Sequence, residues 1–240
     1  MNRLFMAVVL MCACAGANAT AIKTYEARLE VAADGSALVT VNLKLTGSQP
    51  GMVPLPVGFG TLDDFQLQDA PRGVQLNPVP SKDQSIVEID LPQAVAADVK
   101  LSFTFRAPDV LAQPKNTAGE KSGLPAGSRL LRHGFVNTQA ATIAAYRVEV
   151  RLPEEVRVQM IREQLPKPKR TEVLPRVRLD RIDGNQGALL QVANLKQGDK
   201  TSMVLEVVED GRSYVWLLVG LLLSAAYLVG FRDLVTPAAR

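Results

Sequence analysis

Residues 25–31 and 39–45, which read YEARLEV and VTVNLKL, decide the fold. In both stretches apolar side chains alternate with polar ones, which is the period of two that a strand with one buried and one solvent-facing side requires. Asp34 and Gly35 lie between the stretches, and this dipeptide is typical of the tight turn that joins two antiparallel strands. We therefore predict a β-hairpin with one buried face near the start of the folded domain.

The same alternation recurs along the chain, at residues 99–106, 146–152 and 201–209. Prolines lie at short intervals between Pro50 and Pro92, and because proline cannot donate to a sheet ladder, they mark edges and loops. The sequence between residues 20 and 212 has no sustained helical stripe. The pattern predicts an all-β body that consists of one or two antiparallel β-sandwich (Ig-like) domains.

The number of domains depends on residues 109–129, a stretch rich in glycine and proline that interrupts the strand pattern. The segments on either side of it resemble each other: Ile22-x-x-Tyr25-x-Ala27-x-Leu29 matches Ile143-x-x-Tyr146-x-Val148-x-Val150. We predict one sandwich over 20–108, a linker or long loop over 109–129 and a second sandwich over 130–212. The alternative is one larger sandwich with a long loop.

Residues 1–19 have the pattern of a secretory signal peptide. Arg3 precedes an apolar run, and Ala17-Asn18-Ala19 fits the small-x-small sequence at which a signal peptidase cleaves. We predict cleavage before Thr20. Two alternatives are an uncleaved N-terminal anchor and a lipoprotein acylated on Cys14.

Residues 213–231 carry no charge, and as a helix rising about 1.5 Å per residue they would extend about 28 Å, close to the thickness of a bilayer core. We predict a single-pass transmembrane helix there, with residues 232–240 as a cytoplasmic tail and the β body on the periplasmic side of the cytoplasmic (inner) membrane. Small residues spaced four apart favour close packing of membrane helices. The candidates for such packing are Gly220, Ser224, Ala226 and Gly230.

The residue types exclude several chemistries. The only cysteines, Cys12 and Cys14, lie in the predicted signal peptide, so we expect neither thiol catalysis nor a disulfide in the mature chain. His133 is the only histidine, and we interpret it as a structural or surface residue rather than a catalytic base. We expect no metal, no cofactor and no enzymatic activity. The adjacent carboxylates Asp63-Asp64 and Glu154-Glu155 are interpreted as turns, and Asp183-Gly184 as a plain turn rather than a calcium loop.

Residues 157–181 form a basic strip in which eight basic residues outnumber three acidic ones, for a net charge of +5. Such a strip could contact anionic headgroups or an acidic protein, whereas the alternative is a solvated loop. It lacks interleaved aromatic residues, and the whole chain has a net charge of only +3, so we expect no nucleic-acid partner. The candidate contact residues are Lys167, Lys169, Arg170, Arg176 and Arg178.

Together these features favour a membrane-anchored extracytoplasmic β-sandwich protein that acts by protein contact, as an accessory or scaffold subunit of a bacterial cell-envelope complex. Two other functions stay open, a binding module for carbohydrate or cell-wall material and an envelope hydrolase. The partners expected are the membrane and envelope proteins, and the sequence names no small-molecule ligand.

Overall fold

The computed structural model describes residues 20–81, 84–93, 96–114, 124, 127–162, 176–209 and 213–230, the last with side chains only for 218–227. The predicted signal peptide, the predicted cytoplasmic tail and the middle of the basic strip lie outside these residues.

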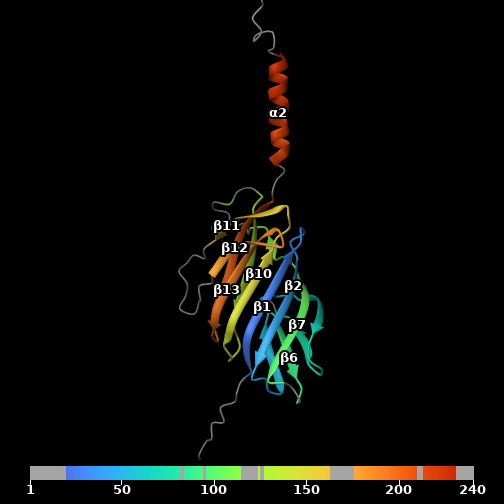
Figure 1. The fold of residues 1–240 in the computed structure, drawn as a ribbon, viewed down its shortest axis with the longest axis vertical. Coiled ribbons are helices and arrows are strands. Elements are labelled where there is room, and N and C mark those ends of the chain that lie inside the picture. Colours follow the sequence, from blue (N-terminus) through green and yellow to red (C-terminus); the bar gives the residue numbers. More distant parts are fainter. Residues whose placement is uncertain are drawn as a thin grey trace, which may run out of the picture.

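The described chain is mostly β-structure arranged in three sheets. Figure 1 shows strands of the largest sheet lying side by side. This seven-stranded sheet has the order β12 (Arg176–Ile182), β13 (Asn185–Leu195), β10 (Ile143–Arg151), β1 (Ala21–Val31), β2 (Ala37–Thr46), β7 (Asp98–Ala107) and β4 (Asp63–Asp69). The four-stranded sheet consists of β11 (Val156–Arg162), β14 (Lys200–Glu209), β9 (Arg129–Val136) and β8 (Leu111–Ala112). The three-stranded sheet consists of β3 (Gly51–Pro56), β6 (Ile86–Leu91) and β5 (Gln75–Val79).

The hairpin predicted from alternation is confirmed. Strands β1 and β2 pair antiparallel with Leu29 opposite Val39, and the apolar residues of the alternating pattern, at 25, 27, 29 and 31 and at 39, 41, 43 and 45, are buried. The strands predicted within residues 99–106, 146–152 and 201–209 are β7, β10 and β14. The prolines of β3 and β5 lie on the two edge strands of their sheet, where a missing N–H leaves the ladder intact.

The two similar segments on either side of residues 109–129 pair with each other. Strands β1 and β10 lie side by side and parallel, with Ile22 opposite Ile143 and Tyr25 opposite Tyr146. The sequence similarity was interpreted as a repeat of whole sandwiches. Instead, it follows the register of two neighbouring strands in one sheet. The sheet is therefore not purely antiparallel, and the two predicted domains share it, which agrees with the alternative of one larger unit.

One hydrophobic core joins the three sheets. It contains Tyr25 and Tyr146 from the seven-stranded sheet, Phe135 from the four-stranded sheet and Leu55 from the three-stranded sheet, all at most 1% exposed. The ring of Phe135 lies 5.4 Å from that of Tyr25 and 4.4 Å from that of Tyr146, centroid to centroid. One face of the large sheet thus packs against both smaller sheets, and its other face is left polar.

The described part of the predicted linker belongs to the fold. Strand β8 pairs with β9, Leu111 is buried, and its N–H donates to the carbonyl of Gly35 at 2.9 Å. Gly35 has φ 92°, and a Cβ there would lie 2.6 Å from the Leu111 carbonyl oxygen, so the turn between β1 and β2 requires glycine. Residues 109–112 are therefore not a linker, because they close the four-stranded sheet against this turn.

The segment predicted as a membrane span contains an α-helix, α2 (Ser213–Gly230), of 18 residues. Its helical conformation agrees with the prediction. No helix in the described part of the chain meets the length and apolarity needed to cross a bilayer.

Gly187 on β13 lies close against the backbone of the neighbouring strand β10. A Cβ added there would lie 2.3 Å from the carbonyl oxygen of Val150 and 2.9 Å from Cδ1 of Ile182. We expect Gly187→Ala to lower the free energy of unfolding by about 1–3 kcal/mol, because the backbone of β10 must move to admit the methyl group. Gly134→Ala is the matched control, since Gly134 also lies in a strand but has open space around a Cβ. Equal urea midpoints for the two variants would contradict this.

Candidate functional site

The polar face of the seven-stranded sheet carries charged side chains in register on neighbouring strands. Its outward residues line up in rows across the strands, because side chains in register point to the same side. Glu26 lies opposite Arg147, Arg28 opposite Glu149, and Glu30 opposite Arg151. Each of these three register positions places opposite charges on β1 and β10, and Glu30 and Arg151 form an ion pair. We call this set of six residues the charged array.

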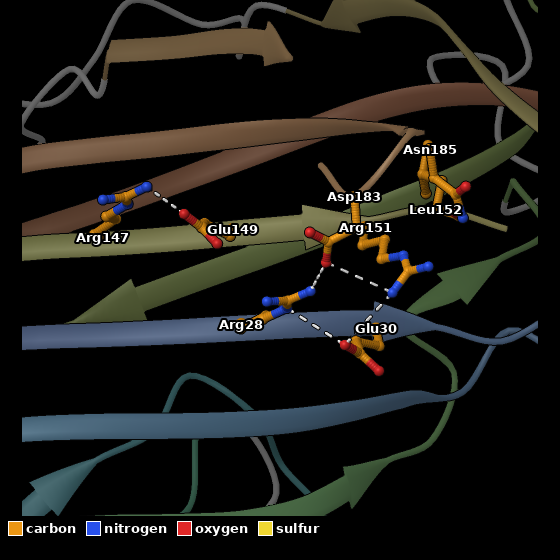
Figure 2. A network of polar contacts seen from close by, with 8 residues as sticks. All are labelled: Arg28, Glu30, Arg147, Glu149, Arg151, Leu152, Asp183 and Asn185. Atoms are coloured by element: carbon orange, nitrogen blue, oxygen red, sulfur yellow. Dashed lines mark hydrogen bonds and ion pairs between the residues drawn. The ribbon is translucent and has the colours of Figure 1, made fainter. Parts of the chain in front are cut away.

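An ion-pair network crosses the charged array, as Figure 2 shows. The guanidinium of Arg28 donates to Asp183 and lies 3.3 Å from Glu30. Arg151 lies 3.9 Å from Glu30 and 3.8 Å from Asp183, measured from Nη1 to the carboxylate oxygens. The hydrogen bond to Asp183 raises the pKa of Arg28 above its usual value, and the charges of the nearby carboxylates add to this effect.

A tight turn places the Asp183 carboxylate over the network. Asp183 and Gly184 have φ 50° and 86° and join β12 to β13, with Ile182 opposite Asn185. Two successive residues of positive φ give a hairpin turn whose twist matches that of its strands, and Asp-Gly adopts it readily. Nδ2 of Asn185 donates to the carbonyl of Leu152 at 3.1 Å, which fixes the turn at the end of β10.

Two shallow depressions flank the network. One, of about 180 Å³, is lined by Glu26, Arg28, Asn42, Arg147 and Glu149 of the open sheet face. The other, of about 230 Å³, lies at the turn and is lined mainly by Glu154, Arg157, Arg181, Asn185 and Gln186. Both expose cations and anions together. Such surfaces suit a partner that presents complementary charges over a broad area.

The structure brings part of the basic strip to this face. Arg176 and Arg178 are exposed on β12, at the edge of the seven-stranded sheet, where Arg176 pairs with Gln191 and Gln191 with Arg147. Their stretch of the strip is therefore a strand and not the loop that the alternative assumed. Arg178 lies 3.6 Å from Asp180. Lys167, Lys169 and Arg170 lie outside the described residues.

The other predicted site residues are placed elsewhere. Gly220, Ser224 and Ala226 are exposed on α2, where the Ser224 hydroxyl donates to the carbonyl of Gly220 at 2.8 Å. Gly230 is the last residue of α2, and its exposure lies outside what the structure describes. Glu154 and Glu155 form a turn as predicted, but Asp63 and Asp64 begin strand β4.

His133 lies in the core, 2% exposed, on β9. Its Nε2 is 2.7 Å from the hydroxyl of Tyr146, and its ring lies 5.3 Å from that of Phe59. Burial lowers the pKa of His133 to about 4, so the imidazole is neutral at pH 7. This placement agrees with the interpretation of a structural histidine.

Sequence reasoning missed the charged array, although a signal for it was present. The two similar segments, aligned on Ile22 and Ile143, place a cation opposite an anion at three successive outward positions. Complementary charges at directly opposite positions are a mark of neighbouring strands. The same similarity also fits a repeat of whole domains, and it becomes a statement about pairing only when these charges are compared.

Among the described residues no group of three or more histidine, cysteine, aspartate or glutamate side chains is arranged to hold a metal ion. The sequence matches no protein-family model and no curated protein at a significant level.

Several solved structures are similar to this chain at low identity. Leukotriene A4 hydrolase from Saccharomyces cerevisiae is 11% identical with a TM-score of 0.42, and the match covers 78% of this chain and 29% of the hydrolase. A putative protease from Parabacteroides distasonis is 8% identical with a TM-score of 0.45, covering 79% of this chain and 40% of that one. A putative nutrient binding protein from Legionella pneumophila is 11% identical with a TM-score of 0.42, and the match covers 79% of this chain and 67% of that protein. This chain thus spans less than half the length of the first two proteins, and likenesses of this size say nothing about its activity.

Proposed function

We propose that this chain is a contact protein of the bacterial cell envelope, an accessory or scaffold subunit that binds protein partners through the polar face of its seven-stranded sheet. The charged array carries this proposal. Within the array Arg28, Glu30 and Arg151 form ion pairs with one another or with Asp183, and Arg147 pairs with Glu149. A surface that is ordered before binding loses less side-chain entropy on association.

The ion pairs of the array fix the positions of their side chains and contribute little to the stability of the fold. The side chains of these ion pairs are between 25% and 56% exposed, and each such pair contributes about 1 kcal/mol or less. Their alternating signs instead define which opposing surface fits, because like charges brought together would repel. A rigid polar pattern of this kind is suited to selecting a protein partner.

The aromatic side chains favour this function over carbohydrate binding. Sugar sites commonly use exposed rings, whereas the rings of this β body lie within the core or against it. They are Tyr25, Phe59, Phe65, Phe103, Phe105, Phe135 and Tyr146.

The cellular location is also part of the proposal, and it is inferred from the sequence. An N-terminal segment with the pattern of a signal peptide and the uncharged residues 213–231 would export the β body and tether it to the cytoplasmic membrane. If so, the full chain is expected in the membrane fraction after carbonate extraction. Its recovery in the supernatant would contradict the tether.

Photo-cross-linking in cells tests the contact function. A photoreactive residue at Glu26 or Arg147, in the charged array, is expected to give discrete adducts with another envelope protein. Met52, 61% exposed on the three-stranded sheet, is the matched control and is expected to give several-fold fewer adducts. Equal adducts from both surfaces, or none from the array, would overturn the assignment of this face.

A further inference from the structure

The two edge strands of the seven-stranded sheet carry opposite charges. Strand β12 at one edge holds three arginines and one aspartate, a net charge of +2, and β4 at the other edge holds three aspartates and no basic residue, a net charge of −3. Both strands have seven residues, and almost every one of them is exposed or partly exposed. Among the described strands, none pairs with the outer side of either.

The strand directions allow the two edges to join. Strand β12 runs the same way as β10 and β1, because β13 is antiparallel to both of its neighbours and β1 is parallel to β10. Strand β4 runs the opposite way, because each step from β1 through β2 and β7 to β4 is antiparallel. When two copies face the same way, β12 of one therefore meets β4 of the next as an antiparallel pair, which can form a regular ladder.

Each edge also exposes a leucine on the same side of the sheet. Leu179 of β12 is 50% exposed and lies opposite Ala188, while Leu67 of β4 is 45% exposed and lies opposite Phe103. Ala188 and Phe103 are both fully buried, so the two leucines face the core side. Joining the edges would bring these leucines together and remove apolar surface from water.

Charge also selects which edges join. Two β12 edges would place arginines against arginines, and two β4 edges would place aspartates against aspartates, so pairing of identical edges is disfavoured. Pairing of β12 with β4 is favoured, and it is a head-to-tail contact that leaves one free edge on each side of the pair.

We propose that a second copy of this chain adds its β4 edge to the β12 edge of the first, so that the seven-stranded sheet continues from copy to copy. This goes beyond the proposed function, because it requires no other protein and uses the sheet edges rather than the charged array. The register of β4 shifts between Asp63 and Gln66 and between Leu67 and Asp69, which shortens the regular ladder. We therefore expect a weak contact that forms at low salt and high local concentration.

Disulfide trapping of the full chain in membranes tests the pairing. In a background with Cys12 and Cys14 replaced by serine, one tagged copy carries Arg178→Cys and a differently tagged copy carries Gln66→Cys. Both positions lie on the polar side of their edge strands, Arg178 opposite Leu189, the neighbour of Glu149, and Gln66 opposite Thr104. An oxidant, or a short bis-thiol cross-linker that tolerates a shifted register, is expected to give at least tenfold more mixed dimer than either cysteine gives with itself. Equal yields from the three combinations, or no dimer, would overturn the proposal.

Charge reversal supplies a second, independent measurement. In the copy that carries Arg178→Cys, Arg176→Glu with Arg181→Glu is expected to reduce the mixed dimer about tenfold, and Asp63→Arg with Asp69→Arg in the other copy is expected to restore it. Restoration also shows that the reversed edge is folded, since an unfolded strand would not regain its partner. Lys23→Glu, on the central strand β1, is the control and should leave the yield unchanged. Loss without restoration would reject edge pairing, while adducts from Glu26 to another protein would still support the proposed function.

Discussion

Tyr146→Ala is expected to lower the free energy of unfolding by about 3–5 kcal/mol, the usual cost of deleting a fully buried aromatic ring. Tyr146 is 1% exposed at the centre of the core, with its ring 5.0 Å from that of Tyr25 and 4.4 Å from that of Phe135. The loss is expected to be large because these rings belong to two different sheets, and the cavity would lie where the sheets meet.

Tyr146→Phe is the matched control. It keeps the ring and removes only the hydroxyl that lies 2.7 Å from Nε2 of His133, so its cost should be about 1–3 kcal/mol, from the histidine left without its partner. Urea unfolding followed by circular dichroism measures both variants. A phenylalanine variant as unstable as the alanine variant would show that the hydrogen bond, not the packing, dominates.

Alternation was enough to predict four strands of the seven-stranded sheet, β1, β2, β7 and β10, and strand β14 of the four-stranded sheet. The first four bury one face and leave most of the other exposed or partly exposed, so the period of two is visible in their sequences. Strand β12 does alternate, with Val177 and Leu179 between Arg176, Arg178 and Asp180, but the pattern is short and lies in a charge-rich stretch, so it does not stand out from the rest of the basic strip.

Pairing could not be predicted by the same means. Alternation fixes which residues of a strand are buried but not which strand lies beside it, and parallel neighbours can be far apart in sequence. Strands β1 and β10 are the example. The similar sequences around Tyr25 and Tyr146 align in the same register in which the two strands pair, but a repeat of two domains accounts for that similarity equally well. The ion pair between Arg28 and Asp183 is harder still to predict, because Asp183 lies in the turn between β12 and β13. Its closeness to β1 can be inferred only when the order of the strands in the sheet is known.

Acid is expected to destabilise the β body through His133, by about 3 kcal/mol between pH 7 and pH 4. The pKa of His133 is lowered to about 4 in the folded chain, against an ordinary value of about 6.5 for an unfolded one. Above pH 6.5 the imidazole is neutral in both states and contributes no pH dependence. As the pH falls from 6.5 to 4, only the unfolded chain takes up the proton, so stability falls, and below 4 both states are protonated and the loss is complete.

The surroundings of His133 explain why its pKa is lowered in the folded chain. Nδ1 of His133 is buried and has no hydrogen-bond partner among the described residues, so an imidazolium would bury a charged N–H without an acceptor. Nε2 faces the hydroxyl of Tyr146, which cannot offer a compensating charge in this range because burial holds the pKa of Tyr146 well above its usual value. Tyr25, beside it, is raised in pKa by the same cause.

His133→Gln separates this effect from the titration of carboxylates. Glutamine retains a polar group toward Tyr146 but does not titrate, whereas the aspartates and glutamates are common to both proteins. The variant is expected to be less stable than the wild-type chain at pH 7, and the gap should narrow by about 3 kcal/mol as the pH falls to 4, because only the wild-type chain pays for keeping its histidine neutral. Urea midpoints measured by circular dichroism at half-unit pH steps give both curves. A gap that stays constant from pH 7 to pH 4 would mean that His133 titrates alike in the folded and unfolded chains, which its burial against Tyr146 and Phe59 does not allow.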